Sequence, residues 1–212
     1  MAYDSKKKKL SFRILTSVML LAAVAFLFIP NIMLSTRTTK TDSSVVVSST
    51  FSGADIILGA FASDKKEIDK TKIETDGTYG AEGVYYLKTE GEVKGLTTKI
   101  ITNTLALFIM FAALFAGMAA ILNFFTIGDK WPKYNKHIDP MISFLIIASA
   151  VCAIVAFAVS FFWISGEYGN GMVGDELVRT TMQSYGYVGL IGAVILPALS
   201  WVFFHDRRIK EE

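Results

Sequence analysis

Apolar residues along the chain are gathered into four long stretches. Charged residues are absent from the windows 14–36, 100–128, 140–166 and 180–205. Each window exceeds the roughly 20 apolar residues that a helix needs to cross a hydrocarbon core of about 30 Å, and soluble proteins seldom carry even one such run. The pattern predicts a mainly α membrane protein, a four-transmembrane-helix bundle. The four spans are expected over 14–34, 100–127, 140–164 and 185–204.

The N-terminal segment 1–13 is basic and precedes the first apolar run. That run is long and no small-x-small cleavage site follows it, so we interpret it as an uncleaved signal anchor. The positive-inside rule then places both termini in the cytoplasm, together with the loop 128–139 and the tail 205–212. The basic residues of 1–13 are interpreted as orientation signals in preference to a site for anionic lipid.

The charge count on the two sides of the membrane agrees with this orientation. The expected inner segments hold 11 basic and 6 acidic residues, whereas the expected outer segments hold 10 basic and 13 acidic residues. The first outer segment is long enough that its own charges weigh little in the rule.

The longest polar segment, residues 35–99, is expected to form a small β-rich extracellular domain between helices 1 and 2. Its β-branched content predicts strands over Ser43 to Phe51 and over Val84 to Thr89. The charged stretch Lys65 to Glu74 is compatible with a surface helix or an edge strand. A cysteine-free domain of this size has little core, so it is expected to lean on the bundle or on a partner.

One stretch of this outer segment, Ala54 to Ala62, is too apolar to be left in water. We interpret it as a third strand or short helix that closes the local core, in preference to a partner-binding patch. The possible contacts with the bundle or a partner are Ile56, Ile57, Leu58 and Phe61.

The second outer loop, 165–184, is rich in glycine and is expected to be flexible. Asp175 and Glu176 are placed to begin a helical turn that leads into the fourth span. The acidic residues of the loop lack the regular spacing of a calcium loop, so we interpret them as solvated.

Small residues at intervals of four predict the faces on which the spans pack. In the third span these are Ala148, Cys152, Ala156 and Ser160; in the second, Ala113 with Gly117; in the fourth, Gly189 with Ala193. Packing within one chain is favoured over homodimer contacts. Pro197 predicts a kink in the fourth span, static in preference to a gating hinge.

The candidate chemistry of the sequence is sparse. A net charge of +2 offers no basic face for nucleic acid, and the absence of ionisable residues deep in the spans argues against a pump or carrier. Cys152 is the only cysteine and lies inside a span, while His137 and His205 lack the cysteines of a zinc site. We therefore expect no catalytic, cofactor-binding or metal-binding residue and no cofactor.

The order of spans, with both ends inside and a long first outer loop, resembles the claudin-like tetraspan layout. The resemblance covers topology alone. The paired cysteines and the Trp-Gly-Leu-Trp pattern of claudins are absent here, so no residue role is carried over.

These features favour a non-enzymatic membrane protein that acts by association, as an accessory or scaffolding subunit. The alternative is a small oligomeric pore or transporter with a pathway lined by Ser and Thr. The expected partners are the lipid bilayer and a protein partner or further copies of the chain. The expected location is the plasma membrane. A cysteine-free exterior without an Asn-x-Ser/Thr sequence favours a prokaryotic membrane.

Overall fold

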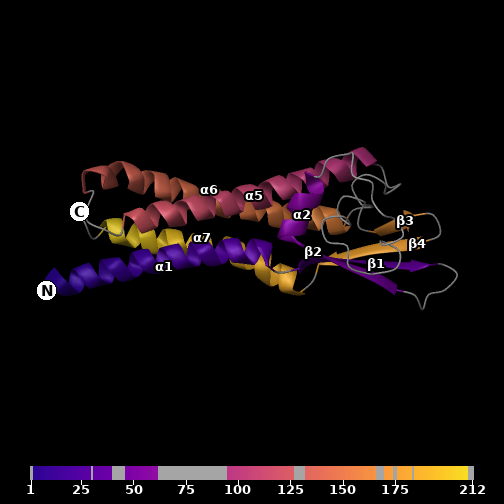
Figure 1. Cartoon of the computed structure of the whole chain (residues 1–212), viewed down its shortest axis with the longest axis horizontal. Coiled ribbons are helices and arrows are strands. Elements are labelled where there is room, and N and C mark those ends of the chain that lie inside the picture. Colours follow the sequence, from indigo (N-terminus) through magenta and orange to yellow (C-terminus); the bar gives the residue numbers. More distant parts are fainter. Residues whose placement is uncertain are drawn as a thin grey trace. The chain divides into compact units, whose positions relative to one another are not determined.

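Four long helices occupy the four apolar stretches of the sequence. The computed structural model describes residues 2–29, 31–39, 46–61, 95–126, 132–165, 170–173, 176–182 and 184–209, with side chains over 10–29, 51–61, 100–126, 138–161 and 184–205. The long helices are α1 (Ala2–Phe28), α5 (Gly95–Phe125), α6 (Pro132–Ser165) and α7 (Ser184–Ile209), and a short helix, α2 (Gly53–Ala60), follows the second strand (Figure 1).

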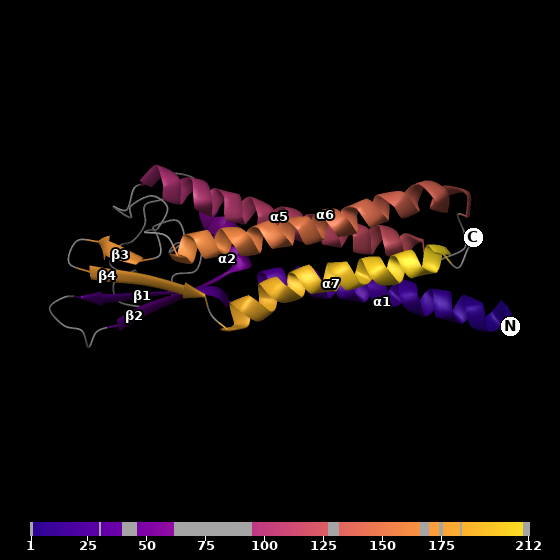
Figure 2. The same cartoon turned by 180° about the vertical axis from the view of Figure 1, so that it is seen from behind.

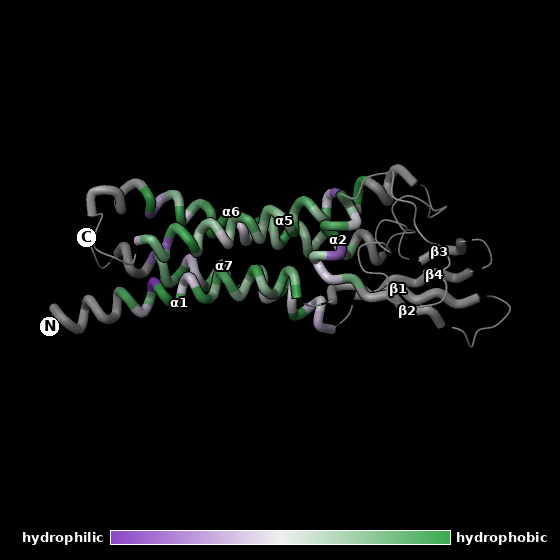
Figure 3. The backbone as a smooth tube through the Cα atoms, viewed as in Figure 1, coloured by the Kyte–Doolittle hydropathy of each residue, from purple (hydrophilic) through white to green (hydrophobic). Residues whose placement is uncertain are grey.

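All four long helices are long and apolar enough to span a membrane. Their apolar spans run over Leu10–Phe28, Ile100–Phe125, Ile138–Phe161 and Ser184–His205, and Figure 3 shows hydrophobic colouring along most of each described span. The chain is therefore a multi-pass α-helical membrane protein whose helices contact the lipid bilayer.

The first span ends earlier than the sequence pattern predicted. The expected span 14–34 is wrong at its C-terminal end, because α1 stops at Phe28 and a strand begins at Asn31. Pro30 explains the break, since proline disfavours helical geometry in the residue before it. At its other end α1 begins at Ala2, so the basic segment is helical as well.

The other long helices extend beyond the expected spans. The sequence predicted a cytoplasmic loop over 128–139, but α6 already begins at Pro132. Proline is favourable at the first position of a helix, where its missing N–H has no intrahelical partner to lose. α7 continues through Pro197 to Ile209.

Four strands form one antiparallel sheet in the order β2-β1-β4-β3. Strands β1 (Asn31–Thr39) and β2 (Val46–Ser52) lie between α1 and α5, and β3 (Asn170–Val173) and β4 (Glu176–Met182) lie between α6 and α7. The central pair is β1 with β4, in which Arg37 lies opposite Val178. The sheet therefore joins two loops that are far apart in the sequence (Figure 2).

The predicted β-rich domain over 35–99 is not supported as a unit of its own. The first expected strand overlaps β2, but the second, Val84 to Thr89, and the charged stretch Lys65 to Glu74 lie outside the described residues. The predicted helical turn at Asp175 and Glu176 is wrong, because Glu176 is the first residue of β4. Pairing with β1 selects the extended conformation that the β-branched residues of β4 favour.

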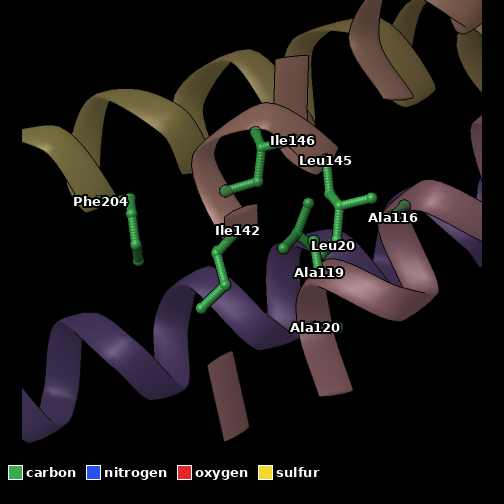
Figure 4. Packing of buried hydrophobic residues seen from close by; sticks show 8 residues of the cluster. All are labelled: Leu20, Ala116, Ala119, Ala120, Ile142, Leu145, Ile146 and Phe204. Carbon is green, nitrogen blue, oxygen red and sulfur yellow. The ribbon is translucent and has the colours of Figure 1, made fainter. Parts of the chain in front are cut away.

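Two compact units make up the chain. The helical unit comprises Met1–Phe26, Phe111–Ile154 and Ile191–Glu212, and the sheet unit comprises Leu27–Met110 and Val155–Leu190. Side chains from all four long helices form the core of the helical unit: Leu20, Ala116, Ala119, Ala120, Ile142, Leu145, Ile146 and Phe204 (Figure 4). The three alanines are all on α5, and their small side chains let neighbouring helices approach closely.

Candidate functional site

In the sheet unit, α2 begins in close contact with two of the long helices. A Cβ atom built on Gly53 would overlap the carbonyl oxygen of Leu27 and would lie 3.4 Å from Cγ2 of Ile109. Leu27 is in the last turn of α1, and Ile109 is on α5. The close approach of the backbones therefore requires glycine at the first residue of α2.

A capping box fixes the N-terminus of α2. The backbone N–H of Asp55 donates to Oγ of Ser52 at 3.2 Å, and the backbone N–H of Ser52 donates to Oδ2 of Asp55 at 2.9 Å. The hydroxyl of Ser52 also donates to Oδ2 of Asp55 at 2.6 Å. These bonds satisfy amide groups that the first turn of a helix leaves unpaired.

Three of the four apolar residues singled out in the stretch 54–62 lie in α2, and the fourth, Phe61, is its C-cap residue, whose N–H donates to the carbonyl oxygen of Ile57 at 3.1 Å. The four residues lie on two different faces. Ile56 is completely buried, and Ile57 is half-buried. Leu58 and Phe61 are 64% and 50% exposed. The short helix was one of the two expected forms of this stretch, but only part of its apolar surface contacts the chain itself.

In the helical unit, a buried polar cluster joins α1 to α5. The side-chain amide of Asn123 donates to the carbonyl oxygen of Arg13 at 2.8 Å and to Oγ of Ser17 at 2.9 Å. The hydroxyl of Ser17 in turn donates to the carbonyl oxygen of Ala120 at 3.3 Å, and Thr126 donates to that of Asn123 at 2.7 Å. Polar contacts of this kind hold membrane helices in one register.

The sequence did not single out Ser17, and it placed Asn123 near a helix end, where water or lipid headgroups were expected to satisfy its amide. That expectation is wrong, because the amide bonds to α1. Asn123 is completely buried, and its Oδ1 has no hydrogen-bond partner among the described residues. The sequence could have indicated this contact because Ser17 lies near the N-terminal end of the first span and Asn123 near the C-terminal end of the second. In two consecutive antiparallel spans these ends lie side by side. The pairing of the two residues depends on the rotation of each helix about its axis, which the sequence alone does not give.

The buried face of α6 is rotated from the face that the small residues predicted. Ala156 and Ser160 are buried, whereas Ala148 and Cys152 are only half-buried. Each interval of four residues advances about 40° around a helix, so the predicted run drifts by about 120° over its length. Six of the buried residues alternate intervals of four and three, and Asp139 and Leu145 are buried as well. The six are Ile142, Ile146, Ser149, Ala153, Ala156 and Ser160.

Of the small residues predicted to pack on α5 and α7, some are buried in helix contacts and one is not. Ala113 and Ala193 are buried, and so is Gly189. A Cβ built on Gly117 would meet nothing within 4 Å, so this glycine does not mark a close helix contact. A glycine that was not singled out, Gly192, does so, since its Cβ would lie 3.2 Å from the ring of Phe26.

The described residues carry few groups with chemical reactivity. Within the described part of the chain, no three His, Cys, Asp or Glu side chains are grouped so that they could hold a metal ion. Cys152 is a half-buried free thiol, and the exposed His205 lies with its ring 5.1 Å from that of Trp201. His137 lies outside the residues whose side chains are described.

Comparison with known protein families, with curated proteins and with solved structures finds no match to this chain.

Proposed function

We propose that the chain is a non-enzymatic membrane protein that acts by association, as an accessory or scaffolding subunit. The observation that carries the proposal is the sheet, which combines two strands from the loop between α1 and α5 with two strands from the loop between α6 and α7. Strands β1 and β4 are paired along Met33 to Thr39. A partner bound to the sheet would meet one surface built from both loops.

The central strands of the sheet are connected to the spans by very short links. Two residues, Ile29 and Pro30, separate α1 from β1, and one residue, Gln183, separates β4 from α7. Links this short leave little freedom between strand and helix. A partner bound to the sheet would therefore act directly on the ends of α1 and α7.

The proposed orientation places the sheet outside the cell and both termini in the cytoplasm, in a plasma membrane. It is supported by the excess of basic residues in the segments that join the other ends of the helices. A prokaryotic plasma membrane suits the absence of exterior cysteines and glycosylation sequences.

The alternative function, an oligomeric pore or transporter, needs hydroxyl groups that face a pathway between subunits. The described structure uses several buried hydroxyls within the chain: Ser17 and Ser149 each donate to a carbonyl oxygen of α5, and Ser160 donates to that of Phe157. These three groups are already engaged, so the association role is the better supported of the two.

Purification from the native membrane under mild detergent tests the proposal. We expect an unrelated protein to copurify in stoichiometric amount and to be lost on Val178→Pro, because proline in central β4 removes an N–H from the sheet. The control is Leu199→Ala on the exposed face of α7, which should keep the partner. A particle made only of identical copies, or a lone chain, would contradict the proposed function.

A further inference from the structure

We propose that α2 is an interfacial helix, whose exposed face, formed by Leu58 and Phe61, inserts into lipid at the membrane boundary where α1 ends. The proposed occupant of this face is the headgroup and acyl boundary of the adjacent leaflet. The inference rests on the membrane-spanning helices and on the contacts of α2, and it does not depend on a protein partner.

The length of α1 sets the depth of α2. The apolar span of α1, Leu10–Phe28, has 19 residues, which corresponds to about 28 Å of helix, close to the thickness of the hydrocarbon core. A span with no surplus length has its two ends at the two boundaries of that core. Leu27 therefore lies at one boundary, and Gly53 packs directly against its carbonyl oxygen.

Gly53 also packs against the apolar span of α5. Ile109 lies inside the apolar span of α5, which begins at Ile100, and its Cγ2 is the side-chain atom nearest to a Cβ built on Gly53. The nearest atoms to a Cβ built on Gly53 thus all belong to two apolar spans. Figure 1 shows that α2 runs across α5 and not along it. A helix that lies in the plane of the membrane interface has this orientation.

The residues of α2 do not form a polar face that could be exposed to water. Its residues are Gly, Ala, Asp, Ile, Ile, Leu, Gly and Ala, and its single charged group, Asp55, is held in the capping box by Ser52. A helix that is apolar all round is stable inside a protein or in a membrane. Among the residues that the structure describes, one side of α2 is covered and the side of Leu58 is not, so that side requires an apolar environment.

The two sides of α2 are clearly separated. Gly53, Ile56 and Ala60 follow helical spacing and are buried. Leu58 and Phe61 are three residues apart, and therefore lie on one face, and both are at least half exposed. Ile29, the residue directly after α1, is 78% exposed, so a third large apolar side chain is uncovered at the same boundary.

Lipid explains this surface better than a docked protein does. A face at the depth of Leu27 is adjacent to the bilayer in the isolated chain, whereas a protein partner would have to displace that lipid. Burial of Leu58 and Phe61 in the interface would anchor the C-terminal end of α2, just as the contact with Leu27 anchors its N-terminal end. The sheet, which precedes α2 directly through β2, would then be held close to the membrane surface.

Nitroxide labels on single cysteines test the proposal in the full chain, reconstituted in phosphatidylcholine vesicles. Cys152→Ala removes the only native thiol, and Leu58→Cys or Phe61→Cys then carries the label. Val151→Cys, on an exposed face in the middle of α6, reports lipid contact. Ile56→Cys, on the buried face of α2, reports a site covered by the chain.

Collisions of the label with oxygen, which partitions into lipid, are compared with collisions with a water-soluble nickel chelate. At positions 58 and 61 we expect greater accessibility to oxygen than to nickel, as at position 151 but nearer to the surface. Greater accessibility to nickel would place the face in water and overturn the proposal. Low accessibility to both reagents, as at position 56, would show that protein covers the face and would overturn it equally.

Discussion

Asn123 on α5 and Ser17 on α1 are joined by a buried hydrogen bond of 2.9 Å between the side-chain amide and the hydroxyl. The same amide also donates to the carbonyl oxygen of Arg13, so Asn123 contacts two positions of α1 that are one helical turn apart. A slide of one residue along α1 moves these groups by about 1.5 Å. The pair therefore fixes the register of α1 against α5 in the helical unit.

Removal of this bond should reveal coupling between the two residues. We expect Asn123→Ala and Ser17→Ala each to lower the free energy of unfolding in detergent by about 1 kcal/mol. In the double variant the loss should be smaller than the sum of the single losses by about 0.6–1.7 kcal/mol. The measurement is a double-mutant cycle by denaturant unfolding, and strictly additive losses would contradict the contact.

The buried face of α6 should not tolerate a larger side chain. Ala156 is completely buried, so Ala156→Leu should overpack the helix contact and cost about 1–3 kcal/mol. Ala158, two residues further along, is exposed, and Ala158→Leu should leave the thermal midpoint in detergent almost unchanged. Equal midpoints for the two variants would mean that the buried face of α6 is wrongly assigned.

Two glycines should respond in opposite ways to the same change. Gly53→Ala places a methyl group against the carbonyl oxygen of Leu27 and should cost about 1–3 kcal/mol. Gly117→Ala meets nothing within 4 Å and should keep or raise stability, because alanine is the better helix former by about 1 kcal/mol. Thermal unfolding of both variants in one detergent checks the difference, and a stable Gly53→Ala protein would refute the close approach of α2.

The first outer segment should not fold alone. Residues 37–99 include β2 but omit most of β1 and all of β4, so the central strand pair cannot form. Ordering about 60 residues costs roughly 90 kcal/mol of chain entropy at about 1.5 kcal/mol per residue. We expect an amide spectrum with little dispersion from the isolated segment. Well-dispersed signals would identify an autonomous domain and would contradict the dependence on β4.

The four spans could be predicted because the signal is local. A charge-free run that is long enough to cross the hydrocarbon core as a helix seldom forms any structure other than a membrane helix. The end of α1 was missed for an equally local reason: Ile32, Met33 and Leu34 continue the apolar run beyond Pro30, and hydropathy alone does not distinguish the strand from the helix.

The sheet could not be predicted because its central pairing is between distant segments. Residues 176–182 carry β-branched side chains, but the choice between a helical turn and a strand is made by β1, more than 130 residues earlier. Likewise, the composition of the stretch 54–62 indicated that it is apolar, but did not indicate which side of α2 would be covered by α1 and α5.

The rotation of the helices limited the prediction of the packing residues. Ala148 and Ser149 differ by one position, yet Ser149 is buried and donates to the carbonyl oxygen of Ala112 at 2.9 Å. The intervals of four residues predicted the buried side of α6 correctly near Ala156. Towards the N-terminal end of α6 they predicted residues that are only half-buried. A buried hydroxyl that bonds to a neighbouring helix is hard to distinguish, from sequence alone, from one that bonds to its own helix.

The most direct test of the account is the side of the membrane on which the sheet and the termini lie. In a Cys152→Ala background, single cysteines at Ser49 in β2, Ser5 in α1 and Lys210 near the C-terminus can be probed in intact cells with an impermeant maleimide. We predict labelling of position 49 in intact cells, and labelling of positions 5 and 210 only after lysis. Labelling of either terminal position in intact cells, or protection of position 49 until lysis, would contradict the proposed arrangement of four spans with an external sheet.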